Sequence, residues 1–386
     1  MELYFLLLLF LLMMAALGFG FPVAFALPGS AILSIGLAAI TGLLLFGDAK
    51  AFFHQDGPIE WLSAGIMNFR AIYYDFERDT LIAIPLFIFM GIMLQRSRIA
   101  EDLLMTMAGL FGPVPGGLGI SVVFVGALLA ATTGIVGATV VAMGLISLPS
   151  MMRNKYSPSL ATGTICASGT LGQIIPPSIA LVLLGDVMSN AYQRAQNNLG
   201  VFSQETVSVG DLFVGAVVPG LMIVIGYLIY TILINRKKEF VVIEETKGEA
   251  NILKTLLPPA TLIFVVLGSI IGGIATPTEA AGVGALGALI IAAINGNANL
   301  ELIKTTSYKS ATVTTMIFSI LIGASIFSLI FRGVGGDLLV DQIFEMMPGG
   351  KYTALFFILF AIFLFGFILD FIEICYVIIP LVAPPF

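Results

Sequence analysis

Charged residues are scarce in this sequence. Of its 386 residues only 10% are Asp, Glu, Lys or Arg, whereas 59% are hydrophobic and the mean hydropathy is +1.07. A soluble domain carries about 25% charge, so this composition excludes a soluble globular protein and predicts an all-α polytopic membrane protein. Because the apolar runs recur along the whole chain, residues 3–21 are expected to be a first span, not a cleaved signal.

Histidine and cysteine are nearly absent as well. The single histidine, His54, lies in a polar stretch, which argues against a histidine-based metal site and against a proton-pumping subunit with mid-membrane histidines and lysines. Cys166 and Cys375 lie in apolar segments and are predicted to be buried thiols. The spans contain no nucleophile–base pair and the chain has no basic stripe, so neither an enzyme, a cofactor nor a nucleic-acid partner is expected.

What the sequence has in abundance is apolar runs, and a spanning helix needs about 20 such residues. The predicted spans are 3–21, 23–46, 81–95, 103–150, 158–184, 212–235, 255–274, 277–294, 308–331 and 351–386. The run 103–150 is too long for one crossing and is expected to be broken or folded back. The polar breaks are 47–80, 153–157, 186–211, 236–254, 295–307 and 332–350.

The basic residues of these breaks predict an orientation, because Lys and Arg near span ends mark the cytoplasmic side. Those that place a break inside are Arg153, Lys155, Arg236, Lys237, Lys238, Lys304 and Lys309. The acidic loop 186–211 is then outside. The stretch 47–80, which is acidic and holds Trp61, is either an amphipathic segment at the headgroups or a plain solvated loop.

Three pairs of segments indicate an internal repeat. Gly20–Ile40 resembles Gly273–Ala293, Pro85–Gly91 resembles Phe327–Gly333, and Leu129–Met151 resembles Leu369–Phe386. With opposite starting sides, they predict an inverted repeat of the secondary-transporter kind, over 1–184 and 255–386, joined by an external loop, a helix and a basic cytoplasmic loop at 185–254. A partner for Pro176–Pro177 would fall beyond Phe386, so the second repeat is expected to be C-terminally incomplete.

The segment "ASGTLGQIIPPSIALVLL", residues 167–184, breaks a membrane-type run. Pro176 and Pro177 remove two backbone donors and free carbonyls one turn earlier, and such backbone is tolerated only beside protein or a watery cavity. With the hydroxyls of Ser168, Thr170 and Ser178, these oxygens suit Na⁺. The helix that restarts after Pro177 would direct its N-terminus at a carboxylate. The alternative is a structural kink in a scaffold helix.

A second apolar run carries small polar residues in "AATTGIVGAT", at Thr132, Thr133 and Gly134, which indicates either a second part of the site or helix packing through small residues. Asp370 and Glu373 stand three apart and are expected on one helix face. A carboxylate deep in a span is a functional candidate, and the alternative is a structural, protonated acid.

Four further charged residues receive weaker interpretations. Glu279 is either functional or a complement to a helix N-terminus, Asp186 is expected to cap the segment that follows the double proline, and Arg332 and Asp337 are expected at an interface.

Five ordered segments resemble the large membrane subunit of TRAP (tripartite ATP-independent periplasmic) transporters. They are "GFPVAFALPGSAIL", "PLFIFMG", "GTLGQIIPPSIALVLLGDV", "DLFVGAVVPGLM" and "IATPTEAAGVGALGAL". The resemblance implies a Na⁺-driven secondary importer of organic acids in the bacterial inner membrane, with re-entrant hairpins, broken helices and an elevator-type motion. It also implies two partners: a small four-helix membrane subunit and a periplasmic substrate-binding protein.

The resemblance also implies site residues. The Na⁺ ligands are expected at Thr132, Thr133, Gly134, Ile135, Ser168, Gly169, Thr170, Pro176 and Asp370, and the substrate-binding residues at Thr170, Gln173, Pro177, Ser178 and Glu373. The chain departs from the family pattern where a serine-rich tip is replaced by Thr133–Val136, and it lacks the second, Thr-Pro-Pro hairpin. Its sequence segments resemble those of a subgroup whose binding proteins take 2-oxo or 2-hydroxy carboxylates. The alternative is a stand-alone Na⁺/dicarboxylate symporter without a binding protein.

Overall fold

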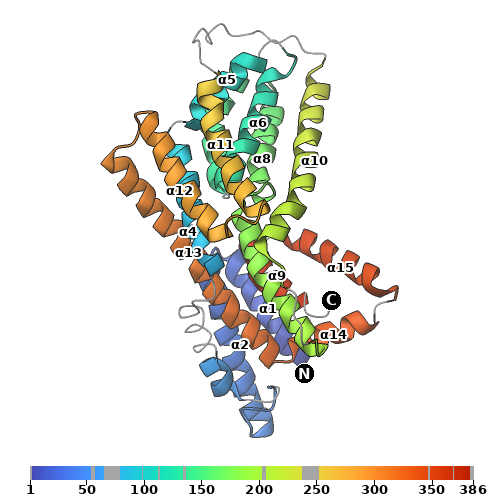
Figure 1. Cartoon of the computed structure of the whole chain (residues 1–386). Coiled ribbons are helices and arrows are strands. Elements are labelled where there is room, and N and C mark those ends of the chain that lie inside the picture. Colours follow the sequence, from blue (N-terminus) through green and yellow to red (C-terminus); the bar gives the residue numbers. More distant parts are fainter. Residues whose placement is uncertain are drawn as a thin grey trace. The chain divides into compact units, whose positions relative to one another are not determined.

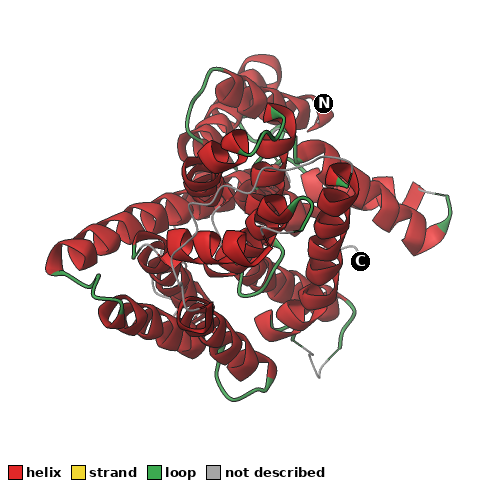
Figure 2. Ribbon diagram, turned by 90° about the horizontal axis from the view of Figure 1, so that it is seen from above, coloured by secondary structure: helices red, strands yellow, loops and turns green. Residues whose placement is uncertain are grey.

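The computed structural model describes residues 2–53, 57–64, 79–97, 99–111, 114–133, 136–201, 206–236, 252–346, 348–367 and 369–382. In these ranges no residue lies in a strand (Figure 2), which confirms the all-α fold class. By length and composition, the described helices that can cross a membrane are α2 (Val23–Phe46), α10 (Val209–Asn235), α12 (Pro277–Ile294) and α13 (Leu300–Gly333). Shorter apolar helices accompany them.

The chain divides into two compact units, each built from separate parts of the sequence. Unit 1 comprises Met1–Arg78, Asp186–Val207 and Thr315–Phe386, and unit 2 comprises Asp79–Gly185 and Ser208–Thr314. The boundaries therefore fall within α9 (Ile179–Asn198) and α13. The two units are defined by contacts between residues in space, whereas the predicted repeat is defined by similar sequence segments. The units therefore do not test the repeat, and the inverted repeat and its boundaries stay a prediction.

Unit 2 is a bundle of apolar helices (Figure 1). Besides α10 and α12 it contains α4 (Asp79–Arg96), α5 (Ile99–Phe111), α6 (Gly117–Thr133), α7 (Val136–Arg153), α8 (Pro158–Thr170), the 3₁₀ turn η1 (Leu171–Gln173) and α11 (Ile252–Ile271). Its core joins α5, α6, α7 and α8 through buried side chains such as Leu103, Val122, Met143 and Ile165. The run 103–150 forms α5, α6 and α7, which confirms the expected break.

Small residues let α12 approach its neighbours closely. A Cβ atom on Gly284 would lie 2.6 Å from Met90 Sδ of α4 and 3.1 Å from Val266 Cγ2 of α11. Between membrane helices such close backbone approach replaces the hydrophobic driving force, which lipid does not supply. Thr276 and Glu279 begin α12 as a capping box, since the Thr276 N–H donates to Glu279 Oε2 at 2.8 Å. Glu279 therefore has the structural role that the sequence left open.

Replacing Gly284 with leucine should destabilise unit 2, because the added side chain overlaps Met90 and Val266. Overpacking of this kind costs about 1–3 kcal/mol, which thermal unfolding in detergent will register as a lower midpoint temperature. Gly282→Leu on the same helix is the matched control, since nothing lies within 4 Å of its Cβ position. Equal effects of the two substitutions would contradict the packing argument.

Unit 1 contains both ends of the described chain. Its helices are α1 (Glu2–Gly18), α2, α14 (Gly336–Met346), α15 (Gly350–Phe365), α16 (Phe371–Glu373), the π-helical turn η3 (Ile374–Ile378) and α17 (Ile379–Val382), with parts of α9 and α13. The Phe10 ring of α1 meets Phe327 and Phe331 of α13 edge-on at 5.8 and 6.0 Å. Gly47 ends α2 in the left-handed conformation, with φ 70°, that glycine adopts at little cost.

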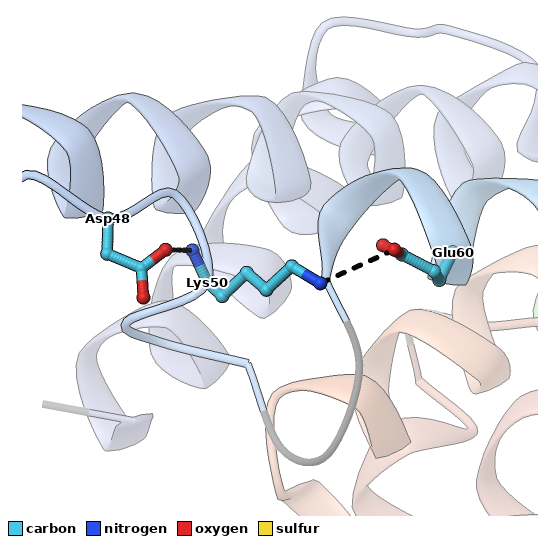
Figure 3. A network of polar contacts seen from close by, with 3 residues as sticks. All are labelled: Asp48, Lys50 and Glu60. Atoms are coloured by element: carbon cyan, nitrogen blue, oxygen red, sulfur yellow. Dashed lines mark hydrogen bonds and ion pairs between the residues drawn. The ribbon is translucent and has the colours of Figure 1, made fainter.

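A small polar network follows α2 (Figure 3). Asp48 Oδ1 accepts a hydrogen bond from the Lys50 backbone N–H at 2.9 Å, and Lys50 Nζ lies 3.4 Å from Glu60 Oε1. The next residue in the chain, Trp61, places its ring against Gly333, where a Cβ would lie 2.8 Å from Trp61 Cδ2. Residues 58–64 are helical, so part of the polar stretch 47–80 is an ordered helical turn, while 65–78 lie outside the described residues.

The Glu60 carboxyl should contribute a small, pH-dependent stabilisation. Its pKa is lowered, first by a hydrogen bond from its own backbone N–H and then by Lys50. A lowered folded-state pKa stabilises the fold above the unfolded value of about 4.3, and this contribution is lost as the pH falls through the folded value. Glu60→Gln should therefore lower the thermal unfolding midpoint slightly at pH 7, and this effect should shrink as the pH falls below about 4.3. A difference that grows on acidification would contradict the pairing.

Several predicted breaks are wrong in extent. The chain is helical through Asn198 inside the predicted loop 186–211, from Leu300 inside 295–307, and through α14 inside 332–350. These stretches are polar but carry no helix-breaking residue at those points, and Val187 and Ala191, four apart, are both buried. Conversely, the predicted span 351–386 is divided between α15 and α16.

Candidate functional site in unit 2

The helices α6 and α7 of unit 2 pack against the helix that leads into the double-proline segment. The helices α6 and α7 are separated only by residues 134–135, and α8 packs against both. A Cβ on Gly126 of α6 would lie 2.5 Å from Ser168 Cβ, and a Cβ on Gly169 would lie 2.4 Å from Val140 Cγ2 of α7. Glycine at both contacts brings the end of α8 against α6 and α7.

The helix then breaks at the double proline, as the sequence predicts. α8 ends at Thr170, one 3₁₀ turn follows, and α9 begins only at Ile179. Pro176 and Pro177 are joined by a cis peptide bond, and both are buried. The amides of Ile174 and Ile175 both donate to the Leu171 carbonyl, at 3.0 and 2.9 Å, so the turn supplies part of its own hydrogen bonding.

Hydroxyl groups line both sides of this break. Ser178 Oγ donates to the Gln173 carbonyl at 2.8 Å, so it spans the break and bonds one carbonyl that the prolines leave outside the helical pattern. Ser168 Oγ donates to Ile165 O at 3.0 Å, and both serines are fully buried. Each hydroxyl donates its hydrogen bond to a carbonyl. The lone pairs of the hydroxyl oxygen are then free to bind a cation.

The remaining predicted residues of this region have different places. Thr170 is exposed and its Oγ1 donates to Ala167 O at 2.8 Å. Gly169 serves helix packing. Thr132 and Thr133 form the end of α6, but their side chains, with Gly134 and Ile135, lie outside the described residues. Unit 2 thus brings together Ser168, Gly169, Thr170, Gln173, Pro176, Pro177 and Ser178 in one broken segment beside α6 and α7.

Asp370 and Glu373 belong to unit 1, and the prediction that they share one helix face is wrong. Asp370 precedes the helix as its N-cap, is exposed, and accepts a hydrogen bond from the Phe371 N–H at 2.8 Å. Glu373 lies inside the helix, only 2% exposed, and its Oε2 has no hydrogen-bond partner among the described residues. Asp370 is the last residue before α16 and Glu373 is the last residue within it, so the two carboxylates occupy different local environments.

Two weaker predictions also change, whereas the interface position of Arg332 and Asp337 stays a prediction. Asp186 lies within α9 instead of capping its end. Cys375 is buried as expected, but the prediction for Cys166 is wrong, since this residue is exposed on α8. Asp337 lies in the first turn of α14, where its Oδ1 accepts from the Leu338 N–H, and Arg332 lies in the last turn of α13.

Sequence reasoning missed a glycine that seats the end of α8 before the broken segment and a tyrosine that joins the starts of α6 and α8. Gly126 gives Ser168 its place against α6, and Tyr156, a buried residue between α7 and α8, accepts a hydrogen bond from the Gly119 N–H at 3.2 Å. A glycine in the apolar run of α6 was the available signal for Gly126. Nothing in the sequence distinguished Tyr156 from an ordinary loop residue.

The helical fold and its membrane-length apolar helices define a polytopic membrane protein. Residues 8–386 match the family described as "Tripartite ATP-independent periplasmic transporter, DctM component", and the chain belongs to that family. It is therefore an integral membrane protein, the large permease component of a secondary transporter.

Two curated relatives are C4-dicarboxylate TRAP transporter large permease proteins. The one from Rhodobacter capsulatus is 32% identical over 329 residues, covering 84% of this chain and 70% of the relative. The one from Vibrio cholerae is 35% identical over 290 residues, which are 74% of this chain and 55% of the relative. The chain thus spans only just over half the length of the second relative.

Among solved structures, the YdaH transporter of Alcanivorax borkumensis resembles the chain with a TM-score of 0.55 and 15% sequence identity. The match covers 94% of this chain and 83% of that one. At this identity the likeness concerns the fold alone, and it supports a transporter-type helical architecture.

Ser178→Ala should destabilise the broken segment, because it leaves the Gln173 carbonyl without the hydroxyl that now donates to it. A buried carbonyl that loses its donor costs about 1–3 kcal/mol, measurable as a lower unfolding midpoint in detergent and as faster amide hydrogen exchange at 178–182. The control is Thr162→Ala, which removes an exposed hydroxyl on α8 that donates to Pro158 O. Equal stability of the two variants would show that the bond across the break contributes little.

Proposed function

We propose that this chain is the transport subunit of a Na⁺-coupled importer of an organic acid, a 2-oxo or 2-hydroxy carboxylate or a dicarboxylate. The observation that carries the proposal is the broken segment between α8 and α9, held against α6 and α7 with Ser168 and Ser178 buried at its two ends. Irregular backbone at membrane depth is tolerated only beside protein or a polar cavity, and in secondary transporters such breaks bind the substrate and its coupling ion.

The chemistry of the segment fits both ligands. Hydroxyl and carbonyl oxygens are hard donors that suit Na⁺, and Ser168, Thr170 and the carbonyls near Pro176 supply them. The first turn of α9, preceded by Pro177 and Ser178, offers backbone N–H groups and the positive end of the helix dipole to a carboxylate. Gln173 is the further polar side chain on the substrate side. Membership in a family with C4-dicarboxylate relatives supports an organic acid as cargo.

In unit 1 the proposal assigns Asp370 to a second Na⁺ site and Glu373 to the substrate. Support comes from the burial of Glu373 beside a π-helical turn, where Oε2 lacks a protein partner in the described part of the chain. A buried carboxylate that no side chain neutralises is expensive in a membrane and marks a functional position. The Na⁺ ligands at Thr132–Ile135 remain part of the proposal on sequence grounds.

The proposal includes two protein partners and a location. A small four-helix membrane subunit and a periplasmic substrate-binding protein complete the transporter in the bacterial inner membrane, in line with the tripartite, periplasmic description of the family. Transport proceeds by an elevator-type movement of the site across the bilayer. A stand-alone Na⁺/dicarboxylate symporter is the alternative that the transport assay must distinguish.

Uptake of a labelled 2-oxo acid into proteoliposomes tests the proposal. The vesicles hold the chain and the small membrane subunit, with an inward Na⁺ gradient, and the binding protein is added or omitted. Uptake that needs both Na⁺ and the binding protein is expected. Na⁺-dependent uptake without the binding protein would establish the stand-alone symporter, and uptake indifferent to Na⁺ would refute the ion-site assignment.

Ser168→Ala should raise the Na⁺ concentration for half-maximal uptake about tenfold, since one lost ligand to a charged group costs about 1.5 kcal/mol. Ser121→Ala is a matched control: Ser121 is equally buried on α6 and donates to a carbonyl of its own helix, Gly117 O, at 2.8 Å. Equal Na⁺ dependence in the two variants would exclude Ser168 as a ligand.

A further inference from the structure

A groove runs between α8 and α10 in unit 2, apart from the broken segment. Its volume is about 790 Å³, and residues of α6, α8 and α10 line it. The lining includes Ser157, Ser159, Gly163, Gly226, Tyr227 and Tyr230. None of the residues predicted to bind Na⁺ or substrate lines this groove, so it is a feature that transport chemistry leaves unexplained.

The groove is apolar along its length and polar at one end. Gly163 of α8 and Gly226 of α10 are both exposed, and nothing lies within 4 Å of a Cβ built on either. The two glycines therefore keep the groove open. Ala167 and Ile223 line the far end, whereas Ser157 and Ser159 line the end at the start of α8. From Ser159 to Ala167 the groove extends about 12 Å, at the helical rise of 1.5 Å per residue.

Two exposed cations lie at the polar end. Lys155 precedes Tyr156, whose hydroxyl accepts from the Gly119 N–H. Arg236 follows Asn235, whose Cβ would lie 3.0 Å from a Cβ built on Gly116. Gly119 lies in the first turn of α6 and Gly116 directly precedes this helix, so Lys155 and Arg236 lie at the same end of unit 2. Among the described side chains no acid forms an ion pair with either of them.

We propose that this groove binds an anionic phospholipid, with an acyl chain between Gly163 and Gly226 and the phosphate beside Lys155 and Arg236. A phosphate attracts both cations, and basic residues near a membrane surface contribute strongly to binding anionic lipids. Tyr227 and Tyr230 present an apolar ring with a hydroxyl tip, the combination that suits the boundary between acyl chain and headgroup. A free phosphate ion would leave the apolar part of the groove unfilled, so the occupant is the lipid.

Retention of lipid by the purified full chain tests the proposal. The protein is exchanged into nanodiscs of equal parts phosphatidylglycerol and phosphatidylcholine, extracted, and analysed by native mass spectrometry. The wild type should retain phosphatidylglycerol preferentially, and Lys155→Gln with Arg236→Gln should reduce that preference about thirtyfold. The charge-matched control is Lys304→Gln with Lys309→Gln, which removes two exposed cations of α13, a helix that contributes no residue to the groove, whereas Lys155 and Arg236 each lie two residues from a lining residue.

Two further arms separate the possible occupants. The double substitution Gly163→Leu and Gly226→Leu fills the groove and should abolish lipid retention. Gly215→Leu should not, because Gly215 is an exposed glycine of α10 outside the groove. Glycerol phosphate without acyl chains should not compete with the retained lipid. Equal retention of the two lipids, equal loss in both charge variants, or displacement by glycerol phosphate would each overturn the proposal.

Discussion

Every polar group of the backbone must find a partner inside a bilayer, because hydrocarbon offers none. Continuous helices meet this demand automatically, so each interruption needs a local substitute. Between α8 and α9 the substitute consists of a 3₁₀ turn, two amides that share the Leu171 carbonyl, and the Ser178 hydroxyl on the Gln173 carbonyl. At the break before α16 the Asp370 carboxylate takes the Phe371 N–H. The breaks are thus bonded structures, and their oxygen atoms are held in fixed positions.

Small residues decide how the surrounding helices hold these breaks. Gly126 and Gly169 let α6 and α7 close on α8, and Gly284 lets α12 close on α4 and α11. In a membrane such contacts are the main source of packing energy. The same residue type serves the opposite purpose at Gly163 and Gly226, where no neighbour fills the space and a groove remains. Sequence alone does not distinguish a glycine that permits contact from one that leaves room.

The sequence predicted the architecture well where composition determines it. The apolar runs, the interruption of 103–150 and the break at Pro176–Pro177 are all present, because hydropathy and proline act locally. It failed where polar residues continue a helix, as in α9 through Asn198 and at the start of α13, since a polar stretch without a helix-breaking residue can extend a helix that an apolar segment has already formed. Spacing placed Asp370 and Glu373 on one face, but a helix boundary falls between them, and this depends on the chain near Gly366 and not on spacing.

The length of α13 has a consequence for how this chain meets its bilayer. Its 34 residues extend about 50 Å, whereas the hydrocarbon layer is about 30 Å thick. Glu301, Lys304 and Lys309 are exposed on its first turns, and the apolar portion follows them. Since those charges resist entry into the acyl region, they set a depth below which the helix does not sink. The polar start of α13 is therefore expected to lie outside the hydrocarbon layer, with only its apolar portion inside it.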